Sequence, residues 1–241
     1  MLRMFKGQSP AGAAGAAEAA PRPVEFPSQC LGGFLGRLRR VDPHPAVLDL
    51  GALCGDNIAF LGERGCRVSV ESLRVPPPAE AHDDLHDDFD IDGNGSDAAA
   101  AREPSYVPSD VPIAPLNYPH ESFSGVLAWD AISQMPFQEG VAFVETLRQL
   151  LLEGGVILAY FPGPPGSPQG AAGRYRIIDE SRLIVEPAER TERTRVYENR
   201  EIYALFSRCD IVRLSHLKSG TREVLAVKTA QRNQHRGGRP G

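Results

Sequence analysis

A glycine-rich turn between a short apolar run and a helix is the part of this sequence best suited to bind a ligand. Asp49 is followed by Gly51 and Gly55 in the run LDLGALCGDN. Glycine has no Cβ, so the backbone at both positions can approach a bound group closely. The free N–H groups at the start of the next helix add a partial positive charge that suits a phosphate, a carboxylate or a ribose. We therefore expect Gly51 and Gly55 to lie against a cofactor.

A second acidic residue follows at the spacing typical of nucleotide-binding folds. Glu71 stands 22 residues after Asp49, at the end of the run RVSVE. In such folds an acid about 20 residues beyond the glycine turn accepts hydrogen bonds from ribose hydroxyls. A carboxylate offers acceptors only, which suits a 2′,3′-diol and would repel a 2′-phosphate. The spacing predicts a ribose-binding role for Glu71.

The elements around the turn form a strand–helix–strand unit. The apolar run 46–50 predicts a buried strand, a helix opens at 55 and ends at Gly65, and 67–71 predicts a second strand. Two strands joined by one helix over so few residues must run parallel. The sequence therefore predicts an α/β protein with a parallel sheet.

Further elements follow from apolar spacing and from turn residues. We predict a helix near 30–40, strands at 123–129 and 156–161 with a helix between them that Gly154 and Gly155 end, a polar hairpin at 175–185, a last helix around 202–206, and an antiparallel pair at 210–217 and 221–228.

Composition divides the chain into one domain and three segments not expected to pack. We predict an Ala/Gly/Pro-rich leader over 1–27, a domain over 28–230 interrupted by a mobile acidic insertion at 74–111, and a basic disordered tail over 231–241. Segments with few large apolar residues cannot bury enough surface to offset the entropy of ordering.

Charge, hydropathy and cysteine content exclude several classes of protein. The net charge of −5 argues against nucleic-acid binding through overall charge. No stretch of about 18 apolar residues is present, so we expect no membrane partner. The four cysteines form no CxxC pair, which favours a reducing compartment and predicts a cytoplasmic protein. We expect Cys54 to be a small buried side chain.

Two short runs resemble metal sites, but each lacks an essential residue. His82 and His86 lie four residues apart without the glutamate that a zinc protease motif needs. The run from Asp90 begins like a calcium loop, but its twelfth position is Ala101 where a bidentate acid is required. We predict no metal site.

The ordered set of motifs resembles the class I S-adenosylmethionine-dependent methyltransferases. The runs VLDLGALCGDN and CRVSVESL resemble the first two motifs of that family, and LNYPHESFSGVLAWD and LLLEGGVILAYF resemble its fourth and fifth strands. The resemblance covers about residues 30–228. It implies a doubly wound, mostly parallel seven-stranded sheet with a reversed C-terminal strand and helices on both faces. It also implies S-adenosylmethionine as cofactor and methyl transfer to a small-molecule substrate.

The resemblance assigns roles to individual positions. Asp49 would support the turn near the methionine end of the cofactor, Glu71 would bind the ribose, and Trp129 would face the cofactor. Asp130, at the end of the fourth strand, is the one candidate for a catalytic base. The full set expected to contact the cofactor is Asp49, Gly51, Gly55, Glu71, Leu116, Asn117 and Trp129.

Other interpretations remain open at this point. Leu53 replaces the middle glycine of the family, and no acid matches the end of its third strand, so a non-catalytic binding or regulatory module is the alternative. A nicotinamide-dependent oxidoreductase is the third hypothesis, although G-x-G-x-x-G is absent. Asp49 could instead cap the turn, Asp130 could cap a helix, and Trp129 could belong to the core. We expect substrate selection from 74–111 and 162–198.

Overall fold

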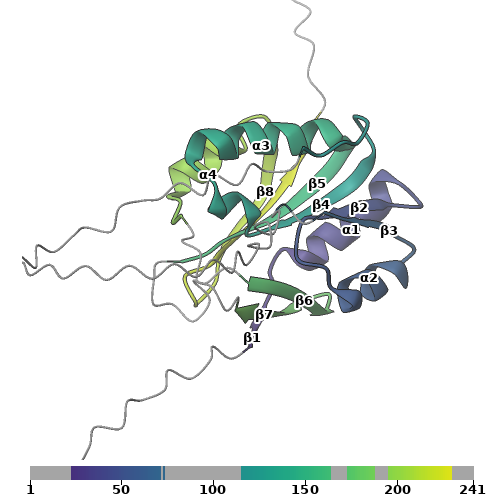
Figure 1. Ribbon diagram of the computed structural model, residues 1–241, viewed down its shortest axis with the longest axis horizontal. Coiled ribbons are helices and arrows are strands. Elements are labelled where there is room, and N and C mark those ends of the chain that lie inside the picture. The colour runs from purple at the N-terminus through teal and green to yellow at the C-terminus, as the bar shows by residue number, and fades with distance from the viewer. Residues whose placement is uncertain (1–22, 72, 74–114, 164–172, 188–194, 230–241) are drawn as a thin grey trace, which may run out of the picture.

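The computed structural model describes residues 23–71, 73, 115–163, 173–187 and 195–229. Its main feature is a six-stranded sheet in the order β3-β2-β4-β5-β9-β8 (Figure 1). The strands are β2 (Ala46–Asp49), β3 (Arg67–Val70), β4 (Phe123–Trp129), β5 (Leu151–Phe161), β8 (Asp210–His216) and β9 (Arg222–Val227). The molecule is thus an α/β protein, as the sequence predicts.

The sheet is mixed and mostly parallel. β2 pairs in parallel with β3 and with β4, and β4 pairs in parallel with β5. The last strand β9 runs antiparallel to both β5 and β8, so the reversed C-terminal strand is confirmed. The described residues give six strands of the predicted seven, and the predicted acidic insertion at 74–111 lies outside them.

Helices cover both faces of the sheet. Alternate strand residues point to opposite sides, and because both sets are apolar, both faces must be buried. Leu48 and Ile157 pack on one face with α3 (Phe137–Leu150) and α4 (Asn199–Leu205). Their neighbours Val47 and Val156 pack on the other face with α1 (Leu31–Val41). Figure 1 shows α3 and α4 above the sheet, with α1 and α2 (Gly55–Gly62) below it.

A second, three-stranded antiparallel sheet lies on the α1 face, in the order β1-β7-β6. β6 (Gly173–Asp179) and β7 (Arg182–Pro187) form the predicted hairpin, and β1 (Val24–Pro27) pairs with β7. Tyr175 and Leu183 turn inward to the core, whereas Glu180 and Arg182 at the tip are exposed. One face of the hairpin therefore belongs to the hydrophobic core, although the sequence predicts a polar hairpin.

The structure corrects two predicted boundaries. Residues 24–27 were assigned to the leader, but they form β1 because their backbone completes the edge of the hairpin. β5 starts at Leu151 instead of Val156, because the chain becomes extended directly after α3. Gly154 then adopts a φ of 75° inside the strand, so this glycine kinks the strand and does not end the helix.

A buried acid joins the start of α1 to the sheet. Glu223 of β9 has no exposed surface, and its Oε2 accepts a 2.6 Å hydrogen bond from the Gln29 N–H. Ser28 and Tyr160 lie beside this carboxyl, and their hydroxyls are 3.1 Å apart. Burial raises the pKa of Glu223, and these hydrogen bonds oppose the rise only in part. The folded protein therefore binds this proton more tightly than the unfolded chain does.

This linkage makes stability depend on pH. The contribution of Glu223 is fully present below about pH 4.5, its ordinary pKa, and is lost as the pH rises through the raised value. We expect the free energy of unfolding to fall over that window, and to fall less in Glu223→Gln. Some slope should remain, because burial also raises the pKa of Asp49.

Urea unfolding at a series of pH values measures the effect. Glu153→Gln changes an exposed acid on β5 and should keep the wild-type slope. An unchanged slope in Glu223→Gln would contradict the account.

Candidate functional site

The predicted ligand-binding residues meet at one edge of the main sheet. β2, β3, β4 and β5 are parallel, so their carboxyl ends lie along the same edge (Figure 1). Asp49 is the last residue of β2, Trp129 is the last of β4, and Glu71 directly follows β3. The Glu71 N–H donates to the Asp49 carbonyl at 2.9 Å, so the two acidic residues are neighbours on adjacent strands.

The Asp49 carboxylate is buried, and one of its oxygens fixes two elements. Oδ1 accepts the Gly51 N–H at 2.9 Å and the Trp129 Nε1–H at 2.5 Å. Burial raises the pKa of Asp49, while hydrogen bonds from Trp129, Gly51 and Asn57 oppose the rise. Asp49 therefore supports the glycine turn, and its predicted contact with a cofactor stays a prediction.

The Trp129 indole lies directly against the glycine turn. A Cβ built on Gly51 would come within 2.7 Å of the indole Cδ1 and 2.8 Å of Nε1. Trp129 is 1% exposed, and its φ of 46° lies in the left-handed region that a bulky residue rarely adopts. Because Gly51 has no Cβ, the Trp129 indole of the same chain can lie directly against its backbone, in the space where a cofactor was expected.

Two tyrosines continue the indole into an aromatic stack of Trp129, Tyr160 and Tyr175. The ring centroid of Trp129 lies 5.1 Å from that of Tyr175 and 5.9 Å from that of Tyr160, with interplanar angles of 13° and 18°. The two tyrosine centroids are 5.4 Å apart. Both tyrosines are buried, and burial raises the pKa of each phenol well above its ordinary value. The stack joins β4, β5 and the hairpin in one packed unit.

Three hydrogen bonds hold the hairpin on the turn and on the helix that follows it. Asn57 of α2 is buried, its Nδ2 donates to the Tyr175 carbonyl at 2.9 Å, and its Oδ1 accepts the Ile177 N–H at 2.8 Å. Arg174 donates to the Leu53 carbonyl at 2.6 Å. Sequence reasoning missed these links, because pairing between residues more than 115 positions apart leaves no local signal.

Glu71 is half-buried and bonds to a residue that the sequence analysis did not single out. The Tyr118 hydroxyl donates to Glu71 Oε1 at 2.6 Å, which raises the pKa of Tyr118. Leu116 packs against the core, and Asn117 is exposed. The predicted segment therefore does reach Glu71, but Tyr118 makes the contact. Tyr118 directly follows Asn117 in the run LNYPHESF, and this proximity was the sequence signal that could have identified it.

Asp130 lies at the start of a short 3₁₀ helix, η1 (Ala131–Gln134), and is 5% exposed. Its carbonyl accepts the Ser133 N–H at 2.9 Å, whereas its side chain makes no capping hydrogen bond. After burial, the Asp130 charge is the second cause that raises the pKa of Tyr175. Asp130 thus stands at the helix start, with its carboxylate near the aromatic stack.

The residues at this edge fit one part of S-adenosylmethionine and not the other. On the adenosine side, Glu71 is half-buried, Gly55 is exposed, and a Cβ on Gly55 would meet no heavy atom of the described residues within 4 Å. On the methionine side, the Trp129 indole fills the space over Gly51 and occupies Asp49 Oδ1. In this conformation the described residues leave Gly55 uncovered, whereas the indole covers Gly51 beside Asp49.

Other features of the described chain add no second centre. Across residues 23–71, 73, 115–163, 173–187 and 195–229, no three His, Cys, Asp or Glu side chains gather closely enough to hold a metal. The runs at His82 and Asp90 lie outside those ranges. The helices within the same ranges are all too short or too polar to cross a bilayer. Cys54 is buried, as predicted.

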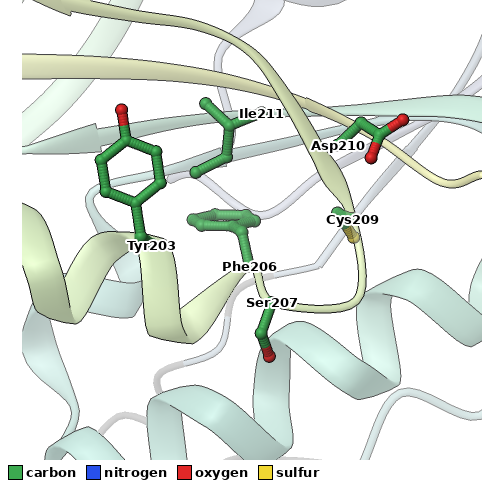
Figure 2. A pocket seen from close by; sticks show the side chains of 6 residues that line it. All are labelled: Tyr203, Phe206, Ser207, Cys209, Asp210 and Ile211. Atoms are coloured by element: carbon green, nitrogen blue, oxygen red, sulfur yellow. The ribbon is translucent and has the colours of Figure 1, made fainter.

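A hollow of about 290 Å³ lies away from this edge, between the end of α4 and β8 (Figure 2). β8 is the outermost strand of the sheet, and β4, β5 and β9 separate it from β2. Asp210 is the single charged residue among those that line it: Tyr203, Phe206, Ser207, Cys209, Asp210 and Ile211. None of these six residues belongs to the set that the sequence predicts to bind a cofactor or to act as a base.

No family model and no curated protein matches the chain. The structure is similar to solved structures of S-adenosylmethionine-dependent methyltransferases. The 1,6-didemethyltoxoflavin-N1-methyltransferase of Burkholderia thailandensis, solved with 1,6-didemethyltoxoflavin and S-adenosylhomocysteine, is 18% identical, with a TM-score of 0.46 over 84% of this chain and 79% of that one. A methyltransferase of Methanosarcina mazei is 13% identical (TM-score 0.45; 79% and 95%). Human N-acetylserotonin methyltransferase, solved with S-adenosylmethionine, is 14% identical (TM-score 0.40; 84% and 52%).

The contact between Trp129 and the turn predicts different effects at the two glycines. Gly51→Ala places a methyl group 2.7 Å from the indole, so we expect a loss of about 1–3 kcal/mol of unfolding free energy, as for other overpacked sites. Gly55→Ala is the matched control, and it should change stability by less than about 1 kcal/mol. Urea unfolding compares the two variants. Equal stabilities would show that the indole does not lie against Gly51.

Proposed function

We propose that this chain binds S-adenosylmethionine at the carboxyl edge of β2, β3 and β4 and transfers its methyl group to a small molecule. One observation carries the proposal. Asp49 and Glu71 end neighbouring parallel strands, are joined through the backbone at 2.9 Å, and flank a glycine turn at the start of α2. The edge beyond parallel strands is where α/β proteins bind nucleotides.

Glu71 is the residue we assign to the ribose. Its bond from Tyr118 uses one oxygen, and a carboxylate has about four acceptor positions, so both ribose hydroxyls still have acceptors. We assign Gly51 and Gly55 to backbone contacts, and Leu116 and Asn117 to the adenine. The half-buried Glu71 and the exposed Gly55 leave this side open to a ligand.

The cofactor would supply a methyl group already activated by the sulfonium charge, so the protein mainly has to position the acceptor. Asp130 is the group we propose as proton acceptor, because its carboxylate lies at the end of β4 beside the aromatic stack. The hairpin reaches the glycine turn through Arg174, and we propose that it takes part in substrate selection.

A non-catalytic binding module is the second candidate function. Two observations favour it: Trp129 holds Asp49 Oδ1, and Leu53, which replaces the middle glycine of the family motif, is 67% exposed in the turn. Such a module would bind the ligand without turning it over. Binding and turnover therefore have to be measured separately.

Calorimetry with S-adenosylhomocysteine tests the binding. Glu71→Ala should weaken the affinity about tenfold or more, because a hydrogen bond to a charged group contributes about 1.5–3 kcal/mol. Glu63→Ala, which removes an exposed acid at the end of α2, should leave the affinity unchanged. The proposal fails if S-adenosylhomocysteine does not bind, or if NADH binds in its place.

Transfer of label from methyl-labelled S-adenosylmethionine to a panel of small metabolites tests the catalysis. We expect turnover in the wild type and a loss of about 10²–10⁴-fold in kcat for Asp130→Asn, the range for a general base. Glu63→Ala again serves as the control. Tight binding without turnover on any acceptor would favour the module, and full activity in Asp130→Asn would exclude Asp130 as the base.

A further inference from the structure

The Trp129 indole occupies the position where the amino-acid end of an adenosine ligand would meet Asp49. We infer that Trp129 determines which adenosine compounds the site accepts: nucleosides without an amino-acid group bind with the indole in place, and S-adenosylmethionine or S-adenosylhomocysteine binds only after the indole has moved. The inference rests on the proposed function, because it concerns the same edge of the sheet.

The indole and an amino-acid group would compete for the same buried carboxylate. Asp49 Oδ1 already accepts the Trp129 Nε1–H at 2.5 Å and the Gly51 N–H at 2.9 Å. A carboxylate buried this deeply needs such donors, since an unpaired buried charge is costly. The ammonium group of an amino acid is also a donor with positive charge, so it would satisfy Asp49 at least as well as the neutral indole does.

Space makes the competition exclusive. The indole Cδ1 and Nε1 lie 2.7 Å and 2.8 Å from the position of a Cβ on Gly51. A single added carbon therefore does not fit between the turn and the ring, and neither does the backbone of an amino acid. A ligand that reaches Asp49 over Gly51 must therefore displace the indole.

The local geometry allows that displacement. Trp129 is the last residue of β4, its φ of 46° is strained, and its pairing with β5 is shifted relative to Leu127. One hydrogen bond to Asp49 and parallel stacking on Tyr160 and Tyr175 hold the ring. If the backbone of Trp129 leaves the left-handed region, the relief of strain offsets part of the free energy needed to break this hydrogen bond and separate the stacked rings.

The adenosine side does not involve the indole. Glu71 bonds to Tyr118, which packs edge-on against Phe123 and lies outside the aromatic stack. At Gly55, a Cβ would meet no heavy atom of the described residues within 4 Å. Adenosine and 5′-methylthioadenosine, which carry the ribose but no amino-acid group, therefore need no movement of Trp129.

Trp129 is the single tryptophan of the chain, so the unaltered protein reports on its own indole. We expect S-adenosylhomocysteine to shift the tryptophan emission to longer wavelength as the buried ring becomes exposed. Adenosine and 5′-methylthioadenosine should bind without that shift. Binding of S-adenosylhomocysteine with unchanged emission would overturn the inference and leave the proposed function intact.

Two variants give an independent measurement. Trp129→Phe keeps an aromatic ring but removes the N–H donor, so S-adenosylhomocysteine should bind about tenfold more tightly, the size expected for one bond to a charged acceptor. Its affinity for adenosine should not change. Tyr203→Phe makes the same kind of change on the exposed side of α4, away from the stack, and should bind both ligands as the wild type does.

The two ligands separate the two claims. If Trp129→Phe binds S-adenosylhomocysteine no better than the wild type, while adenosine still binds both, the inference is wrong and the proposed site stands. If neither ligand binds the wild type or either variant, the proposed function itself is wrong.

Discussion

The structure around the site depends on one buried carboxylate oxygen. Asp49 Oδ1 holds the glycine turn through the Gly51 N–H and the end of β4 through the Trp129 indole. The indole stacks on Tyr175, and this contact packs the β6–β7 hairpin against the main sheet. Because an unsatisfied buried charge would cost several kcal/mol, we expect the loss of one contact to weaken the others. The turn, the aromatic stack and the hairpin are thus linked through one carboxylate.

That unit explains why the edge of the sheet has two different halves. Near β3, Glu71 keeps acceptor capacity and partial exposure, as a ribose site needs. Near β4, the acid that the family resemblance places beside the methionine group is bonded to the protein's own side chain. Under our proposals, the same motif would bind a nucleoside directly and S-adenosylmethionine only after a change in Trp129.

The sequence predicted the architecture well where the signals were local. The strand–helix–strand unit around Gly51 and the hairpin at 175–185 follow from runs of apolar residues and from turn residues within about 25 positions. β1 could not be predicted this way, because its four residues become a strand only through pairing with β7, more than 150 positions later.

The site residues show the same limit. Their positions at strand ends followed from the motif, and the structure has Asp49, Glu71, Trp129 and Asp130 at or directly after the ends of β2, β3 and β4. Side-chain partners did not follow, because the Trp129 conformation and the bond from Tyr118 to Glu71 depend on tertiary packing. The role of Tyr175 was missed for the same reason: its hairpin has a polar sequence, yet the ring completes a buried stack.

A crystal structure of the chain with S-adenosylhomocysteine would show whether the Trp129 indole gives way to the ligand. We expect the ribose hydroxyls to bond to Glu71, the amino group of the ligand to bond to Asp49, and the Trp129 indole to be turned away from Gly51. Ligand bound at another place, or bound at Asp49 with the indole still on Oδ1, would contradict this expectation.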